Sequence, residues 1–244
     1  MDLTHAQVYY GRFLGSQVKR GVKWLEIGCG RQIVPDWAMP LEQQKLLAGK
    51  ASLLVGVDVD PAILDHPFLH AKVLALGGDL PFAADTFDLV SANMVVEHVS
   101  DPRSFLADIY RIVRPGGRFV FHTPNYCNYL VFMASITPDP IKGAVVRLLE
   151  GRREEDRFKT FYRLNTRFRV GKIAQEAGFE VETYVTCGSG EYFGKLGVLG
   201  WLECIILKVL TINNGCFKPN MMVGLRKPVA VHADPVPTMA SARS

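Results

Sequence analysis

Residues 22–30 of the chain, VKWLEIGCG, are the stretch that decides the fold. An apolar run that stops at glycine predicts a buried strand followed by a tight turn. Gly28 and Gly30 let the backbone pass close to a ligand, and amides beyond such a turn can donate hydrogen bonds to it. A dinucleotide-binding loop would place a third glycine at position 33, where this chain has Ile33. The stretch therefore predicts a strand that ends in either a ligand-binding loop or a plain tight turn.

Strands and helices are predicted to alternate along most of the chain. Helices are expected in the first twenty residues and at 41–49, 61–66, 101–113 and 165–179. Strands are expected at 22–28, 52–59, 71–82 (a shorter strand and a loop), 87–93, 118–124, 179–186 and 220–228, with a turn at 114–117. Such alternation is typical of an α/β fold, in which helices cover both faces of a mostly parallel sheet.

Polar residues stand where the predicted strands end. Asp58 closes the second strand, where a carboxylate can accept both hydroxyls of a ribose. Asp79 follows the third strand, where it can accept from an exocyclic amine with Leu80 packing nearby, and Asn93 closes the fourth. The carboxyl ends of parallel strands form the ligand-binding edge of such sheets. Together with the glycine loop, these residues predict a nucleoside pocket.

Five motifs together resemble those of the class I S-adenosylmethionine-dependent methyltransferases: LEIGCG, GVDVDP, GGDLPFAADTFDLV, MVVEHVSDP and RIVRPGGRFVFHTPN, within residues 22–125. The resemblance implies a Rossmann-like, doubly wound, seven-stranded sheet with an antiparallel last strand and helical lid insertions. It also implies S-adenosyl-L-methionine as the cofactor. The implied cofactor contacts are Glu26, Gly28 and Gly30 on the methionine side, Asp58 and Val59 at the ribose, Asp79 and Leu80 at the adenine, and Asn93 near the sulfonium.

The chain departs from the family pattern directly after the glycine loop. Residues 31–40, RQIVPDWAMP, stand where the family often has a third glycine and the start of a helix. The sequence leaves two roles open for Trp37 in this loop, namely covering the cofactor or packing against the protein.

His98 is the leading candidate for a catalytic base. The methyl group of the cofactor is already activated, so the enzyme chiefly aligns a nucleophile with it, and a hydroxyl nucleophile also needs a base for its proton. His98 begins the segment after the fourth strand, and histidine titrates near neutral pH. The alternative is that Glu97 and His98 only shape the pocket, because this pair is widespread in the superfamily. His122 is expected to point into the core.

No metal site is predicted. In the quinone-biosynthesis O-methyltransferases that this segment resembles, an acid precedes the Glu–His pair by three residues, and Met94 stands in that place here. Glu97 and His98 alone are too few ligands for a hard cation, which prefers several oxygens.

A single domain is predicted over residues 1–228, with a cofactor-binding core at 22–125, lid insertions at 126–160 and 188–219, and a flexible tail at 229–244. Residues 147–169 hold eight basic and four acidic residues, which form either a solvated face or a lid over an acidic substrate. Tyr162 and Arg163 in this stretch, and Asn125 after the fifth strand, are the candidate substrate contacts.

The segment 196–212 is strongly apolar but contains Glu203 and Lys208. A membrane-spanning helix needs about 20 apolar residues, so this segment is marginal. Two interpretations stand: a helix buried in a lid, or contact with a membrane surface or a lipid-linked acceptor.

Composition restricts the function further. The net charge of +4 is too small to indicate a nucleic-acid partner, and the five cysteines show no metal or disulfide spacing. With no signal peptide recognised, a cytoplasmic enzyme is expected, with membrane association as a variant. We expect methyl transfer to a hydroxyl or carboxyl of a small-molecule, glycan or lipid-linked acceptor. The rivals are an RNA or protein methyltransferase, a non-catalytic S-adenosylmethionine-binding regulatory module and an NAD-dependent oxidoreductase.

Overall fold

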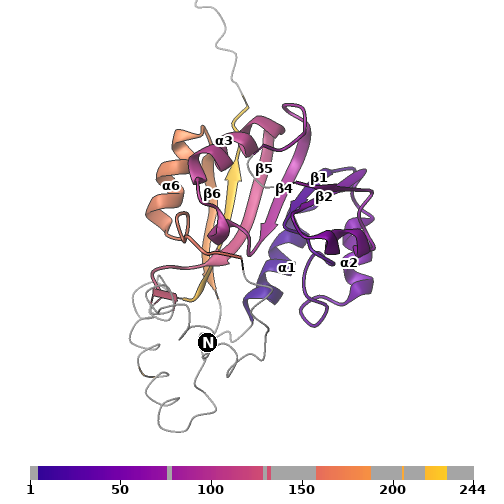
Figure 1. The fold of residues 1–244 in the computed structure, drawn as a ribbon, viewed down its shortest axis with the longest axis horizontal. Helices are drawn as coiled ribbons and strands as arrows, with labels where there is room; N and C mark the ends of the chain where they lie inside the picture. The colour runs from indigo at the N-terminus through magenta and orange to yellow at the C-terminus, as the bar shows by residue number, and fades with distance from the viewer. Residues whose placement is uncertain are drawn as a thin grey trace, which may run out of the picture.

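A computed structural model describes residues 5–75, 79–128, 131–132, 158–187, 205 and 218–229. A seven-stranded sheet runs through these residues in the order β3-β2-β1-β4-β5-β7-β6 (Figure 1). The last strand, β7, is antiparallel to both of its neighbours, and the remaining pairs are parallel. The predicted doubly wound α/β fold with an antiparallel last strand is confirmed.

The elements follow the predicted order closely. The strands are β1 (Lys23–Ile27), β2 (Leu53–Asp58), β3 (Ala71–Leu74), β4 (Phe87–Asn93), β5 (Val113–Pro124), β6 (Glu180–Cys187) and β7 (Asn220–Arg226). The helices are α1 (Ala6–Gln17), α2 (Leu41–Ala48), α3 (Pro102–Ile112) and α6 (Arg167–Glu176), with short 3₁₀ helices η1 (Pro61–Asp65) and η2 (Val96–His98).

Helices cover both faces of the sheet, with α3 and α6 on one face and α1 and α2 on the other (Figure 1). Alternate side chains of a strand point to opposite faces, so each strand contributes to two cores. In β1, Leu25 and Ile27 belong to the core under α3 and α6, whereas Trp24 belongs to the core under α1. The indole N–H of Trp24 donates to Ser91 Oγ of β4 at 2.7 Å. This bond satisfies both polar groups where α1 covers them.

Local signals fix the ends of the helices. Asp101 caps α3, because its Oδ1 accepts from the amides of Arg103 at 3.1 Å and Ser104 at 3.3 Å, and Pro102 is the first helical residue. Gly178 has a φ of +95°, and this left-handed residue turns the chain out of α6 toward β6.

The sequence predicts a turn at 114–117 that ends before the fifth strand begins. This predicted start of the strand is wrong, because β5 begins at Val113 and continues through these residues. The strand is irregular there: Gly116 has a φ of +81°, and the pairing with β4 shifts register between Phe87 and Leu89. Backbone bonds to Lys227 explain the continuation, since the Gly116 amide donates to the Lys227 carbonyl at 2.8 Å and the Lys227 amide donates to the Gly117 carbonyl at 3.0 Å.

Lys227, which follows β7, connects the loop before β4 to the junction between α3 and β5. Its Nζ donates to Asp85 Oδ1 at 2.7 Å and to the carbonyls of Tyr110 and Val113 at 2.8 Å each. The ammonium also lies 4.5 Å from the centroid of the Tyr110 ring. Because Tyr110 and Val113 lie at the C-terminal end of α3, the positive charge also complements the helix dipole.

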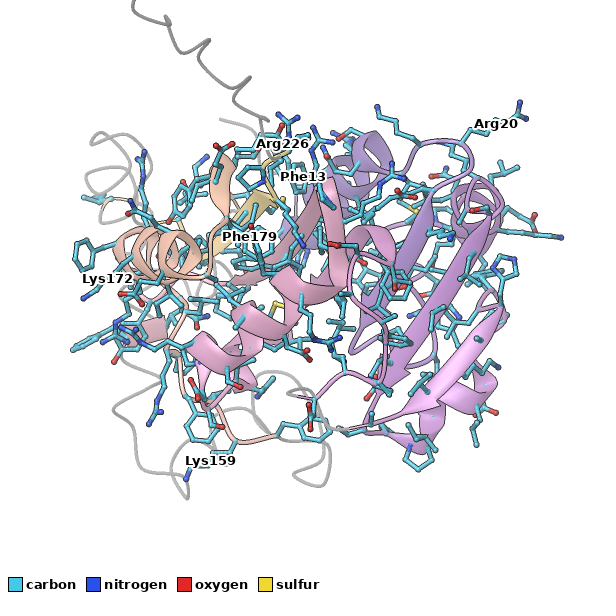
Figure 2. The ribbon with its side chains drawn as sticks, turned by 90° about the horizontal axis from the view of Figure 1, so that it is seen from above. Phe13, Arg20, Lys159, Lys172, Phe179 and Arg226 are labelled. Carbon is cyan, nitrogen blue, oxygen red and sulfur yellow. The ribbon has the colours of Figure 1, made fainter. Side chains whose placement is uncertain are left out.

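We expect Lys227→Met to lower the free energy of unfolding by about 2–4 kcal/mol, because it leaves buried carbonyls without a donor. Urea denaturation measures this loss. Lys172→Met is the matched control, since Lys172 projects from α6 into solvent (Figure 2), and its effect should stay within about 0.5 kcal/mol. Equal effects of the two substitutions would contradict the assignment of Lys227 as a structural tie.

Most of the predicted lids and tail lie outside the described residues. Of the apolar segment 196–212, only Ile205 is described. Within the described ranges, no helix is long and apolar enough to cross a membrane.

Candidate functional site

A cleft of about 590 Å³ opens at the carboxyl ends of β1, β2 and β4. Its lining comes from the carboxyl ends of β1 and β2, Ala75 after β3, the segment from β4 into the start of α3, and residues 158–161. The lining residues include Gly28, Asp58, Val59, Met94, Val95, His98, Val99, Phe158, Lys159 and Phe161. Figure 2 shows Lys159 at the margin of the molecule, well separated from Arg226. The cleft lies where the order of the sheet reverses direction, between β1 and β4, which is the usual ligand position in such folds.

The glycine loop is shaped by close packing between β1 and the segment after β4. Gly28 has a φ of +66°, and a Cβ built on it would lie 2.2 Å from Val95 Cγ2. Gly30 has a φ of +49°, and nothing lies within 4 Å of a Cβ placed there. Gly28 is therefore required by a protein contact, whereas Gly30 faces open space beside the loop.

Asp58 ties this loop to the end of β2. Its Oδ2 accepts from the Gly30 amide at 2.7 Å, and its Oδ1 accepts from the Asp60 amide at 2.9 Å. The side chain is half-buried and lines the cleft beside Val59. The predicted ribose acid thus holds the loop in shape and faces the cleft.

Glu26 lies beneath the loop with an unsatisfied carboxyl oxygen. The residue is 1% exposed, and its Oε2 has no hydrogen-bond partner among the described residues. Burial, with the nearby charge of Asp58, raises the pKa of Glu26 to about 8. A buried acceptor without a donor is costly, so this atom is a natural partner for a ligand donor.

Gln44 of α2 holds the long loop that follows the glycines, a role that sequence reasoning missed. Its Oε1 accepts from the amides of Ile33 at 3.1 Å and Val34 at 3.3 Å. Its Nε2 donates to the carbonyls of Val34 at 2.6 Å and Met39 at 2.7 Å. Trp37 in this loop is 61% exposed, and its ring meets that of His5 at 4.6 Å. Trp37 therefore packs at the surface and does not line the cleft.

The predicted adenine-binding residues lie beyond the cleft lining. Asp79 is exposed and Leu80 is buried. The Leu80 amide donates to Asp108 Oδ2 at 2.7 Å, and Arg111 donates to the Leu80 carbonyl at 2.9 Å. These bonds anchor the loop to α3. The roles of Asp79 and Leu80 at the adenine stay predictions.

Asn93 and His122 form a pair on the α1 side of the sheet. His122 Nδ1 donates to Asn93 Oδ1 at 2.9 Å, and Asn93 Nδ2 donates to Gln7 Oε1 at 2.9 Å. His122 is 1% exposed and stacks on Tyr10, with ring centroids 5.5 Å apart. Burial lowers the pKa of His122 to about 4. His122 points into the core as predicted, and the contact of Asn93 with the cofactor stays a prediction.

The Glu–His pair after β4 divides between two environments. Glu97 is 3% exposed and accepts from Thr123 Oγ1 of β5 at 2.8 Å, and burial raises its pKa to about 7. His98 lines the cleft, its Nδ1 lies 3.1 Å from the Lys159 carbonyl oxygen, and its ring meets that of Phe158 at 5.9 Å. The Glu97 carboxyl therefore makes its hydrogen bond in the protein interior, whereas the His98 imidazole lines the cleft.

None of the three candidate substrate contacts lines the cleft. Asn125 is buried, with its Nδ2 donating to the Lys218 carbonyl at 2.8 Å and its Oδ1 accepting from the Cys127 amide at 3.1 Å. Tyr162 has a φ of +51°. Arg163 donates to the Ser100 carbonyl. Their contact with a substrate stays a prediction.

A family model described as a methyltransferase domain matches residues 9–184. The chain belongs to the class I S-adenosylmethionine-dependent methyltransferases. It is 32% identical over 124 residues to a protein of Mycolicibacterium smegmatis named probable S-adenosylmethionine-dependent methyltransferase, a match covering 49% of this chain and 44% of that protein. It is 29% identical over 176 residues to the ubiquinone biosynthesis O-methyltransferase of Pseudomonas entomophila, covering 68% of this chain and 67% of that protein.

Solved structures support the same fold. A chain in the complex between the Haloferax volcanii Trm112 methyltransferase activator and a methyltransferase superposes with a TM-score of 0.58 at 16% identity, covering 92% of this chain and 90% of that chain. Of the relatives compared by sequence, the Mycolicibacterium smegmatis protein is matched by this chain over less than half of its own length.

The cleft of this methyltransferase fits S-adenosylmethionine, which carries an ammonium group, a sulfonium cation and a ribose diol. Asp58 presents a carboxylate in the cleft lining. Next to the lining, the buried Glu26 Oε2 lacks a donor, and Gly30 leaves open space beside the loop. When bound, the cofactor supplies a methyl group activated for transfer to a nucleophile.

We expect the unfolding free energy of the ligand-free protein to fall as the pH rises from about 6.5 to about 8. The folded-state pKa of Glu26, about 8, lies above its ordinary value of 4.5, so the folded state binds more protons than the unfolded state in this window. The slope from one such group is at most about 1.4 kcal/mol per pH unit. Urea denaturation of the wild type and Glu26→Gln should show a smaller decline in the variant. The raised pKa of Glu97, about 7, adds to the decline of both proteins in the lower part of this window. The lowered pKa values of His66 and His122, about 4, affect stability only below it. Parallel profiles would contradict the assignment.

Proposed function

We propose that this methyltransferase transfers a methyl group to a hydroxyl of a small-molecule acceptor, with His98 as the general base. The contact between His98 Nδ1 and the Lys159 carbonyl, at 3.1 Å, carries the proposal. A carbonyl oxygen only accepts hydrogen bonds, so Nδ1 holds the proton and Nε2 keeps its lone pair. No described residue bonds to Nε2, and the side chain lines the cleft.

This arrangement suits removal of a proton from a hydroxyl. Nε2 of His98 accepts the proton, and the Lys159 carbonyl dipole then stabilises the imidazolium through the Nδ1 hydrogen bond. Asp58 lines the same cleft, and both of its carboxyl oxygens already accept from backbone amides, which supports His98 as the base. A carboxyl acceptor is already ionised near neutral pH and needs no base. The free Nε2 therefore favours a hydroxyl over a carboxyl.

The cleft lining favours a small acceptor with an apolar ring. Met94, Val99, Phe158 and Phe161 give the side beyond the glycine loop an apolar surface, and aromatic side chains pack well on flat rings. Lys159 adds a cation that suits an acidic substituent on the acceptor. The relationship to proteins named ubiquinone biosynthesis O-methyltransferases agrees with such an acceptor. The alternative hypotheses of a glycan or a lipid-linked acceptor rest mainly on stretches of sequence that lie outside the described residues.

We expect His98→Gln to lower kcat/KM for hydroxyl acceptors about 10²–10⁴-fold, because it removes the proton acceptor. Binding of S-adenosylhomocysteine should change less than about twofold, since glutamine keeps much of the side-chain volume in the cleft lining. Transfer of labelled methyl from S-adenosylmethionine to catechols and phenols measures the first effect, and calorimetry measures the second.

The acceptor panel also separates the rival functions. Benzoate and glucuronate test carboxyl acceptors, and tRNA and a basic protein test the macromolecular ones. Label on a hydroxyl that depends on His98 supports the proposal. Label on RNA, on protein or on carboxyls with full activity in His98→Gln contradicts it. Tight cofactor binding without transfer to any acceptor would favour the regulatory module.

A further inference from the structure

The 158–165 segment borders the cleft and is fastened to η2 through its backbone. The amides of Phe161 and Tyr162 both donate to the Glu97 carbonyl, at 2.7 and 3.2 Å. The carbonyl of Lys159, two residues before Phe161, is the one that meets His98 Nδ1. The position of this carbonyl therefore depends on how firmly the segment is held against η2.

A buried relay of side chains holds the far end of the segment. Asn165 Nδ2 donates to Thr123 Oγ1 at 2.7 Å and to the Pro124 carbonyl at 2.8 Å. Thr123 Oγ1 then donates to Glu97 Oε2 at 2.8 Å. Asn165 and Thr123 are fully buried, and Glu97 is 3% exposed. The relay thus joins the segment, β5 and η2 without access to solvent.

The direction of each bond in the relay is set by its chemistry. The Pro124 carbonyl can only accept, so the amide nitrogen of Asn165, not its oxygen, faces β5. The Thr123 hydroxyl accepts from that nitrogen, and its own proton goes to the Glu97 carboxyl. Asn165 Oδ1 has no partner among the described residues, so its donors carry the contact. An aspartate or a hydrophobic residue at position 165 would have no side-chain N–H group to donate to Thr123 and Pro124.

We propose that Asn165 is a positioning residue that, through Thr123 and Glu97, holds the Lys159 carbonyl against His98 and so keeps the imidazole proton on Nδ1. The inference rests on the proposed function only for its catalytic consequence, because the tautomer itself is a property of the free protein. Without the relay the segment loses its buried anchor and His98 loses its fixed acceptor. The imidazole then distributes its proton between both nitrogens, and less of it presents a free Nε2 to the cleft.

The test is the tautomeric state of His98, read from side-chain ¹⁵N shifts of the full-length protein at about pH 9, well above the ordinary pKa of imidazole. The chain has six histidines, and the signal lost in His98→Gln identifies the one concerned. The wild type should show a single Nδ1–H tautomer. Asn165→Ala and the isosteric Thr123→Val should both shift His98 toward a mixture, whereas Thr123→Ser, which keeps the hydroxyl, should restore the wild-type pattern.

Thr166→Ala is the matched control. It removes the N-cap bond from the Arg169 amide to Thr166 Oγ1, at 3.3 Å, one residue beyond Asn165. This variant should lose stability but keep the His98 tautomer. With a hydroxyl acceptor, kcat/KM should fall about tenfold to a hundredfold in Asn165→Ala and Thr123→Val, as expected for a displaced catalytic group, and should stay unchanged in Thr166→Ala.

The outcomes separate this inference from the proposed function. A wild-type Nε2–H tautomer, or an unchanged tautomer in both Asn165→Ala and Thr123→Val, would overturn the positioning role. A tautomer shift in these variants with full activity in His98→Gln would support the positioning role and overturn His98 as the base. A shift of equal size in Thr166→Ala would show a general loosening of the segment and would also overturn the inference.

Discussion

The close contact between Gly28 and Val95 is the constraint on which the site depends. Val95 Cγ2 lies where a side chain at Gly28 would begin, so the segment after β4 comes directly against the end of β1. This approach places His98, three residues after Val95, in the same cleft as Asp58. A larger residue at position 28 would separate the Asp58 carboxylate from the candidate base. The left-handed φ of Gly28 makes the same demand on the backbone.

Buried acids organise the site in two different ways. Glu26 is left with an unpartnered oxygen beneath the glycine loop, where a cationic ligand would stabilise its ionised form. Glu97 is instead satisfied by Thr123 and joins the relay to the 158–165 segment. Both carboxyls have pKa values raised by burial. The first is an unsatisfied acceptor under the glycine loop, and the second is part of the relay proposed to fix the geometry around His98.

The order of the elements could be predicted from the sequence because apolar periodicity, caps and glycines are local signals. Asp101 and Gly178 mark helix ends in the structure as they do in the sequence. Gln44, Asn165 and Lys227 were missed, because each gains its role from partners that are distant in the chain or hidden by folding. Asn125 was predicted as a substrate contact from its place after β5, and only the structure shows its amide bonded to backbone groups.

The most direct test of the account is calorimetric titration of the protein with S-adenosylmethionine and S-adenosylhomocysteine, in the wild type, Asp58→Ala and Asp65→Ala. Asp65 is an exposed acid of η1 that pairs with Arg31 outside the cleft lining, so it controls for loss of charge. The account predicts binding of both compounds that Asp58→Ala weakens by about tenfold or more and Asp65→Ala leaves nearly unchanged. Absence of binding in the wild type, or equal affinity in Asp58→Ala, would contradict it.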